Sequence, residues 1–304
     1  MILKFKFSIT LLFITLFYLK GFSQKSMIEI KTNSRLKFFK LDDQIHFSVN
    51  DSLYRHKGNS FEYLTTSKLW NSEIIQIQDS LFSKRGGGSL FTLRNDFKLD
   101  TLIYAPKMEM SFFNAARFVH NDTIISFGGY GNFVMNNKLI FFTKENKSWK
   151  YFRDLTPESL KPSAGHVLLS SYYNGKFYVY RMLTKSEAPG PENKEVNNSV
   201  FEFNLKTKSW SKYGKANKIS ILIDKGNKVF KLKDKFIVKN GNSIYLFNLK
   251  NHTWIEYENT SSILENIDTM IISNDDEIIT ATFTKNKIRV RSYPFEHFFK
   301  NKLN

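Results

Sequence analysis

The chain has 304 residues, of which 41% are hydrophobic and 16% aromatic, and its 30 phenylalanines and 14 tyrosines exclude disorder over most of its length. Cysteine is absent, which excludes disulfide scaffolds, cysteine-ligated metal centres and thiol proteases. An excess of 45 Lys and Arg over 28 Asp and Glu gives a formal charge of +17, which would suit an anionic partner.

The N-terminal segment, residues 1–23, has the features of a secretory signal peptide. Lys4 and Lys6 precede an apolar or hydroxylic run over residues 7–19, and small residues follow it. This run is shorter than the roughly 20 residues that cross a bilayer. We therefore expect cleavage before Gln24 and export to the periplasm or the extracellular space, with no stable membrane insertion after cleavage and no nucleic-acid partner. A single membrane anchor is the alternative interpretation.

One 13-residue pattern recurs along the remaining chain, residues 24–304. Three clear copies align without a gap, each starting at an asparagine and ending at a tryptophan: Asn137 to Trp149, Asn198 to Trp210 and Asn242 to Trp254. Weaker copies begin at residues 51, 88 and 286. Each copy has the pattern of a β-strand, a polar turn and the start of another strand. A single repeat running from end to end indicates one continuous repeat domain.

Two apolar segments precede each copy, joined by a polar turn of the type that favours β-hairpins. The turns are Asp42-Asp43, Asp79-Ser80, Asn121-Asp122, Asn174-Gly175, Asp234-Lys235 and Asp275-Asp276. Adding the strand after each aromatic anchor gives four strands per unit, and the unit length of about 47 residues matches the roughly 40–50 residues of a propeller blade. The predicted fold is all-β, a six-bladed β-propeller of four-stranded antiparallel blades. A seven-bladed propeller and a pair of β-sandwiches are the alternatives.

Blade 3 contains the sequence features of a known repeat family. Phe127-Gly128-Gly129 ends its second strand, Asn137 and Trp149 follow, and His166 lies early in the next blade. This combination resembles the kelch repeat, in which a double glycine closes an apolar strand ahead of a tryptophan. Blade 4 departs from the pattern with Arg181-Met182 in place of the glycines, and blade 5 with Lys239-Asn240. Since a double glycine permits positive φ and close backbone approach, we expect those two turns to follow another path.

Closure of the ring is predicted to use the N-terminal strand Met27 to Lys31, because this segment belongs to no repeat and the last copy ends near the C-terminus. Such closure removes exposed sheet edges. Each tryptophan is expected to fill the wide outer gap between neighbouring blades. The product is predicted to be a monomer.

The longest connections between second and third strands fall in blades 3 and 4, and long loops on a rigid scaffold are where binding usually occurs. The links 156–164 and 212–227 are expected on the same face. The candidate ligand-binding residues are two aromatic rings, one fixed cation and the carboxylates of the blade-4 loop: Tyr130, Phe133, Arg181, Glu187, Glu192 and Glu195. His166 is interpreted as a structural hydrogen-bonding residue.

Motifs for other chemistry are missing. The six histidines never show the i, i+4 spacing of a metalloprotease helix, the triple glycine 86–88 does not open a phosphate-binding loop, and no Gly-x-Ser-x-Gly elbow occurs. No metal or cofactor is therefore expected. The favoured function is an exported module that binds a protein or glycan through the loops over blades 3 to 5. The alternatives are a sensor module and, by resemblance to sialic-acid mutarotases, a sugar mutarotase or epimerase using Arg181 with Glu187 or Glu192.

Overall fold

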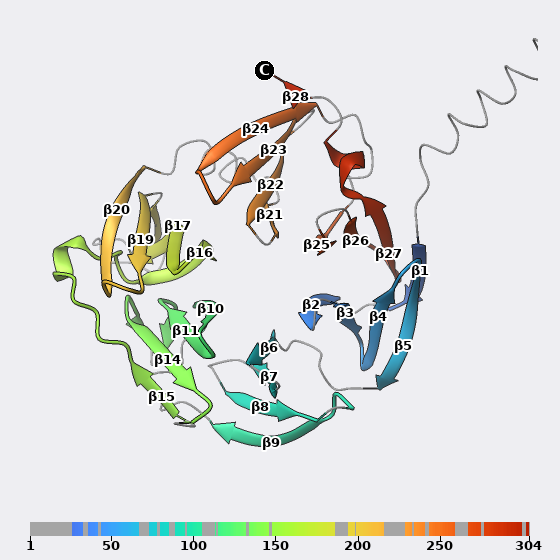
Figure 1. Cartoon of the computed structure of the whole chain (residues 1–304), viewed down its shortest axis with the longest axis horizontal. Coiled ribbons are helices and arrows are strands. Elements are labelled where there is room, and N and C mark those ends of the chain that lie inside the picture. The colour runs from blue at the N-terminus through green and yellow to red at the C-terminus, as the bar shows by residue number, and fades with distance from the viewer. Residues whose placement is uncertain are drawn as a thin grey trace, which may run out of the picture.

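Strand segments rich in Phe, Ile, Val and Tyr form six antiparallel sheets arranged in a ring (Figure 1). The computed structural model describes residues 26–32, 36–41, 44–66, 73–77, 80–84, 89–94, 96–104, 113, 115–131, 134–145, 148–185, 194–197, 199–215, 229–232, 234–240, 243–258, 267–274, 277–299 and 302–303. The expected signal peptide lies outside these residues. The predicted all-β, six-bladed propeller is confirmed.

In blades 1 to 5 the strands follow one another in chain order from the centre of the ring outward. Blade 1 contains β2 (Lys37–Leu41), β3 (Gln44–Val49), β4 (Ser52–Lys57) and β5 (Ser60–Thr66), and blade 2 contains β6 (Glu73–Ile77), β7 (Ser80–Lys84), β8 (Leu90–Leu93) and β9 (Leu99–Tyr104). Blade 3 contains β10 (Ala116–His120), β11 (Thr123–Phe127), β14 (Leu139–Thr143) and β15 (Ser148–Tyr151), and blade 4 contains β16 (Gly165–Tyr173), β17 (Lys176–Lys185), β19 (Ser199–Asn204) and β20 (Ser209–Lys215). Blade 5 contains β21 (Val229–Leu232), β22 (Lys235–Asn240), β23 (Ser243–Asn248) and β24 (Thr253–Glu258).

Blade 6 confirms the predicted closure of the ring. It contains β25 (Thr269–Asn274), β26 (Glu277–Thr284) and β27 (Lys287–Pro294), and its outermost strand is β1 (Ser26–Lys31) from the other end of the chain. Strand β1 pairs antiparallel with β27, and the Glu29 carboxylate lies 2.8 Å from Lys287 Nζ and 2.9 Å from an Arg289 guanidinium nitrogen. The first and last parts of the chain are thereby tied in one sheet.

Further short elements extend this plan. The hairpin of β12 (Tyr130–Gly131) and β13 (Val134–Met135) interrupts blade 3, β18 (Lys194–Asn197) adds to blade 4, and β28 (Lys302–Leu303) pairs with the outer strand of blade 5. Two 3-10 helices, η4 (Glu158–Leu160) and η6 (Phe295–Phe298), lie in connections. Among the described residues, blades 4 and 5 thus each have one short strand in addition to the four predicted strands.

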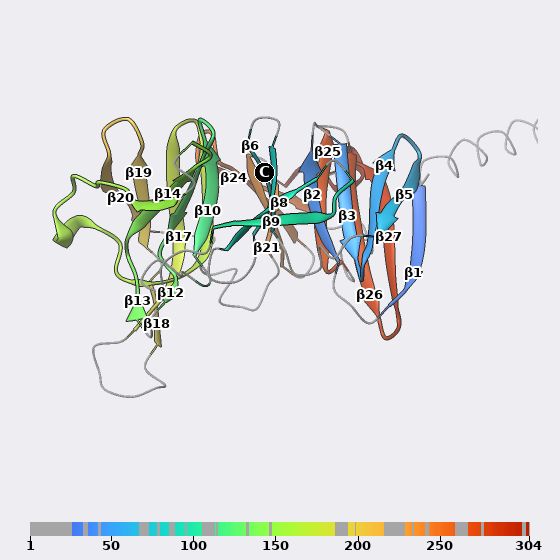
Figure 2. The same cartoon turned by 90° about the horizontal axis from the view of Figure 1, so that it is seen from below.

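The two faces of the ring differ in their connections (Figure 2). The turn face is the one on which the first strand of each blade ends and the second strand begins. At Asn121-Asp122 both residues have positive φ, and so do both at Asn174-Gly175, as two-residue hairpin turns require. The loop face is the opposite one, where second strands lead to third strands and blade leads to blade. The elements β12, β13 and β18 project from the loop face, at the lower edge of Figure 2.

Apolar side chains fill the seams between adjacent blades. Trp149 packs with residues of blades 2 and 3, and Trp210 packs with residues of blades 3 and 4. Both are only 4% exposed, while Trp254 is half-buried between blades 4 and 5. Each tryptophan is paired in register with a phenylalanine on the neighbouring third strand, so the two rings enter the seam together. The expected role of these tryptophans as fillers between blades is confirmed.

Candidate functional site

On the loop face, backbone hydrogen bonds around the double glycine of blade 3 join several segments of the chain. Gly129 N–H donates to the Gly165 carbonyl at 2.7 Å, and Gly165 N–H donates to the Asn136 carbonyl at 3.1 Å. Gly128 and Gly129 have φ of +70° and +89°, and a Cβ on Gly129 would lie 2.5 Å from the carbonyl oxygen of Phe113. No other residue fits that space. These backbone contacts join the entry to blade 3, the β12–β13 hairpin and the start of blade 4 into one rigid base.

Three aromatic side chains gather at this base. Tyr130 directly follows the glycines, and its ring stacks on His166 with a centroid distance of 6.0 Å and an interplanar angle of 30°. Phe113 and Tyr130 exchange two backbone hydrogen bonds of 2.8 Å, and the Phe113 side chain is 50% exposed. We call Phe113, Tyr130 and His166 the aromatic base. His166 is thus part of a ring stack, an arrangement that its interpretation as a structural residue did not include.

In blade 4, where Arg181 and Met182 replace the glycine pair, the chain follows another path, as predicted. The strand β17 continues without a turn through Arg181 and Met182 to Lys185, and its last four residues pair with β18. In this pairing Thr184 faces Glu195, and on the other side Thr184 pairs with Gly165. The hairpin formed by β17 and β18 therefore projects from the loop face beside the aromatic base.

The predicted site residues are described to different extents. Tyr130 lies in the aromatic base, and Arg181 lies on β17, where its backbone pairs with Leu169 across a bulge. Phe133, Glu187 and Glu192 lie outside the described residues. Their joint role as a ligand site, and the mutarotase-like alternative that uses the two glutamates, therefore stay predictions.

The link between blades 3 and 4 leaves the loop face at residues 155 and 156, which the expectation for residues 156–164 did not include, whereas Glu158 accepts a hydrogen bond of 2.6 Å from Asn137. Leu155 N–H donates to the carbonyl of Lys208, a residue of the turn between β19 and β20. The Thr156 hydroxyl accepts a hydrogen bond of 2.6 Å from the backbone N–H of Trp210. The link therefore runs along the outer edge of blade 4, where it satisfies backbone groups that an edge strand would leave open (Figure 1).

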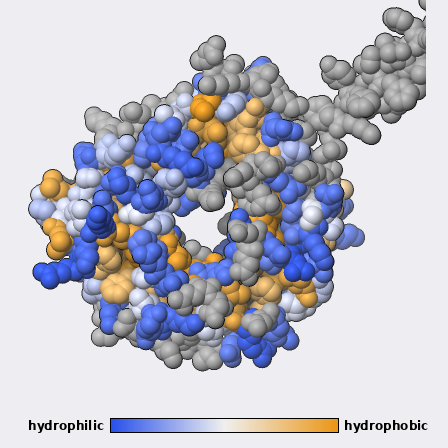
Figure 3. Space-filling view, in the orientation of Figure 1, coloured by the Kyte–Doolittle hydropathy of each residue, from blue (hydrophilic) through white to orange (hydrophobic). Residues whose placement is uncertain are grey.

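The centre of the ring is open (Figure 3). The innermost strands β2, β6, β10, β16, β21 and β25 surround this opening in Figure 1. On the described parts of these strands the Lys, Arg, Asp and Glu residues are Lys37, Lys40, Glu73, Arg117 and Lys231. Basic residues therefore outnumber acidic ones on the described parts of the inner strands, in keeping with the charge of the whole chain.

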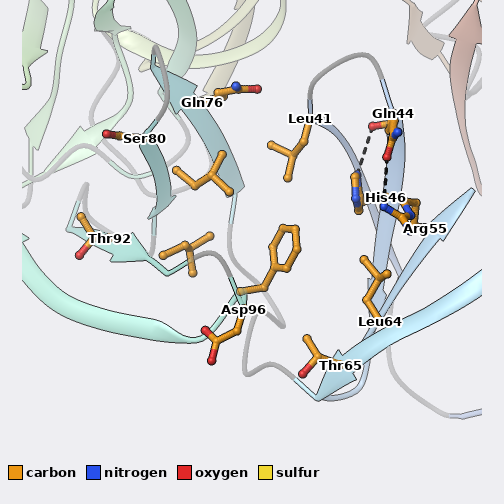
Figure 4. Close-up of a pocket in the computed structure, with 13 residues that line it drawn as sticks. Leu41, Gln44, His46, Arg55, Leu64, Thr65, Gln76, Ser80, Thr92 and Asp96 are labelled. Atoms are coloured by element: carbon orange, nitrogen blue, oxygen red, sulfur yellow. Dashed lines mark hydrogen bonds between the residues drawn. The ribbon is translucent and has the colours of Figure 1, made fainter.

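A second concave region lies between blades 1 and 2, on the turn face (Figure 4). It is a cavity of about 1100 Å³. Its apolar lining consists of Leu41, Leu64, Leu81, Leu93 and Phe97, and its polar lining consists of Gln44, His46, Arg55, Thr65, Gln76, Ser80, Thr92 and Asp96. We call it the blade 1–2 pocket. In Figure 4, Gln44 and Arg55 reach it from one side and Gln76, Ser80 and Thr92 from the other.

Both charged side chains of this pocket have partners. An Arg55 guanidinium nitrogen donates to the Glu62 carboxylate at 2.7 Å, and the other terminal nitrogen lies 3.5 Å from Gln44 Oε1. The backbone N–H of Lys98 lowers the pKa of Asp96, and the nearby Arg94 and Lys98 side chains lower it further. The hydrogen bond from Arg55 likewise lowers the pKa of Glu62. Both carboxyl groups are therefore ionised and paired with cations at neutral pH.

The sequence interpretation missed this pocket, and only part of it had a detectable signal. Blade 2 has Leu93 paired with Leu99 where blades 3, 4 and 5 have phenylalanine paired with tryptophan. A seam without a tryptophan was visible in the repeat alignment as the weak copy at residue 88. The convergence of Gln44, Gln76 and Asp96 was not, because these residues are far apart in sequence.

Comparisons with known proteins assign no relationship: no family model matches the chain, and no curated protein matches it. Among the described residues, no group of three His, Asp or Glu side chains is placed to hold a metal ion. The described part of the chain also contains no helix long and apolar enough to cross a membrane. The fold therefore defines the class, a six-bladed β-propeller, and the function has to be argued from its surfaces.

Proposed function

We propose that this protein is an exported, kelch-like propeller that acts without catalysis and binds a protein or glycan partner on the loop face over blades 3 to 5. The single observation that carries this proposal is the aromatic base held by the glycines of blade 3. Half of the Phe113 surface is exposed there, at the foot of two hairpins that project from the ring. An aromatic ring on a fixed backbone is the usual anchor of a binding surface.

Rigidity supports a binding role for this base. Side chains that are already ordered lose little conformational entropy on association, so more of the contact energy is available for affinity. Tyr130 is fixed on both sides, by its backbone pairing with Phe113 and by its stacking on His166. The exposed aromatic surface favours a protein partner over a glycan, because hot spots of protein interfaces are enriched in aromatic residues.

Two variants test the proposal. Phe113→Ser removes the exposed ring, and replacement of residues 187–192 by Gly-Ser shortens the blade-4 loop while keeping the paired residues of β17 and β18. Partners from the native envelope fraction would be captured on wild-type and variant protein at two salt concentrations and quantified. We expect partner recovery to fall at least roughly tenfold with both variants, since losing a hot-spot aromatic weakens binding by that order.

A matched control keeps the result specific. Tyr63→Ser alters an aromatic side chain that is 52% exposed on blade 1, a blade outside the proposed surface over blades 3 to 5, and should leave capture unchanged. Equal recovery by wild type and both loop-face variants would overturn the proposal. Partners that all three proteins bind and that dissociate with salt would instead reflect the general positive charge.

A further inference from the structure

The blade 1–2 pocket lies on the turn face, away from the loop-face surface proposed above, and two different blades build its walls. We propose that this pocket is a second binding site and that its ligand is an uncharged oligosaccharide. The inference does not depend on a partner at the loop face, because the two sites share no residue.

The charges of the pocket point to an uncharged ligand. Arg55 is compensated by Glu62, and Asp96 lies 3.2 Å from an Arg94 guanidinium nitrogen and 3.6 Å from Lys98 Nζ. An acidic or basic ligand would have to compete with these ion pairs for the same groups. A neutral ligand can use the outer oxygens and nitrogens of the pairs as hydrogen-bond partners and leave the pairs intact.

The remaining side chains match the two kinds of surface on a sugar ring. Two amides and three hydroxyls, from Gln44, Gln76, Thr65, Ser80 and Thr92, offer both donors and acceptors, as sugar hydroxyl groups require. Leucine side chains and the Phe97 ring offer apolar surface for the C–H face of a pyranose. A site of this mixed composition recognises ligands through a few placed polar groups on an apolar lining.

One wall of the pocket is held in place by stacked rings. His46 is 4% exposed and stacks on Phe39 with a centroid distance of 5.6 Å and an angle of 10°. The Phe97 ring lies 5.7 Å from the His46 ring at an angle of 41°. Packing of His46 against both phenylalanine rings gives this wall a defined shape, and a pre-organised wall favours recognition of a rigid ligand.

Size and backbone pairing narrow the ligand class further. The cavity of about 1100 Å³ exceeds the roughly 300–1,000 Å³ of pockets for drug-sized molecules, so it can hold more than one sugar ring. Most of the lining residues come from β3, β4, β7 and β8, and each of these strands is hydrogen-bonded on both sides. These four strands have no open edge for an extended peptide to pair with, so they offer a ligand mainly their side chains.

The test combines a glycan array with calorimetry on the purified protein. The array would display neutral, acidic and amino-sugar oligosaccharides beside a set of peptides. The neutral trisaccharide with the strongest signal would then be titrated into wild-type protein and into the double variant Gln76→Leu/Thr92→Val, which removes polar groups from one wall and leaves every ion pair intact. We expect neutral glycans to dominate the array and the double variant to bind at least roughly tenfold more weakly.

Two further variants make the result decisive. Ser80→Ala is a smaller change that can replace the double variant if that protein is unstable. It should weaken binding by a few-fold. Thr123→Val removes a hydroxyl at the corresponding first residue of β11 on blade 3 and should bind like wild type. The proposal is overturned if only acidic glycans or peptides bind, if no neutral glycan binds, or if binding is the same in wild type and the pocket variants.

Discussion

Two seams of the same ring have opposite character. Between blades 3 and 4, Trp210 lies 4.7 Å from the ring of Phe127 and 5.0 Å from that of Phe203, and the seam is closed by large aromatic side chains. Between blades 1 and 2, the buried core is smaller and mostly aliphatic, around Leu53 and Leu93, and a pocket opens beside it. Both seams are built from the same repeat, so the difference lies in which side chains occupy equivalent positions.

If the blade 1–2 pocket binds a ligand as proposed, this ring assigns stability and binding to different seams. A seam filled to the density of a protein core contributes to the stability of the ring but presents no cavity. A seam with smaller side chains gives up part of that stabilisation and gains a polar concavity on a rigid frame. The predictions below test this division, beginning with the largest expected effect.

Truncation of the tryptophan in the closed seam should destabilise the protein more than truncation in the open seam. Trp210→Ala removes a side chain that is 4% exposed and should lower the free energy of unfolding by about 3–5 kcal/mol. Leu93→Ala, beside the pocket, should cost only about 2 kcal/mol, because the void it leaves adjoins space that water can enter. Urea denaturation monitored by circular dichroism measures both. Equal losses would show that the two seams contribute alike.

The double glycine of blade 3, beside the closed seam, should tolerate substitution poorly. Gly129→Ala places a Cβ 2.5 Å from the Phe113 carbonyl oxygen at a φ of +89°, and should cost about 3 kcal/mol from clash and strain together. Gly175→Ala is the matched control, since its φ is +73° but no atom lies within 4 Å of the added carbon. Gly175→Ala should lower the free energy of unfolding by only about 1 kcal/mol. If the two variants melt at the same temperature, conformational strain alone explains both and the tight approach at Gly129 is unimportant.

The smallest expected effect is a loss of stability at acidic pH, and it arises in a third seam, between blades 4 and 5. The His252 ring lies 4.4 Å from Tyr213 and 4.9 Å from Tyr178, and burial lowers its pKa below 6.5. Because the folded protein resists protonating His252, its contribution to stability is complete above pH 6.5 and is lost as the pH falls below that value.

His252→Asn tests this contribution, since asparagine tolerates the left-handed backbone at this position, where φ is +55°. Urea midpoints measured from pH 7.5 to pH 5 should fall less steeply for the variant than for wild type. Parallel curves for the two proteins would contradict the expected role of His252 in acid sensitivity.

Much of the fold followed from local sequence patterns. The Asn-to-Trp spacing located the third strand and outer strand of blades 3, 4 and 5, and hairpin turns such as Asn174-Gly175 located the inner strands. These signals are reliable because a turn with positive φ accepts few residue types and a seam tryptophan has few substitutes. Even the closure by β1 could be predicted, since the segment from Met27 to Lys31 had no blade of its own.

The candidate surfaces were less accessible to sequence interpretation. Tyr130 was selected as an aromatic residue in a long loop, but its stacking on His166 joins two blades and has no local signature. The excursion of the link at Leu155 and Thr156 was not predicted, because the hydrogen bond between Thr156 and the Trp210 backbone spans 54 residues. Such contacts depend on where the closed ring places each blade.

The sequence by itself determined the repeat and favoured six blades closed by the N-terminal strand, because these features depend on strand periodicity, turn chemistry and the count of repeat units. Only the tertiary structure decided which seam is filled and which is open, and which side chains meet across it. Gln44 and Gln76 belong to different repeats, and each occupies an ordinary position in its own strand. They become walls of one pocket only because neighbouring blades pack face to face, and the side chains between those faces set the volume that remains.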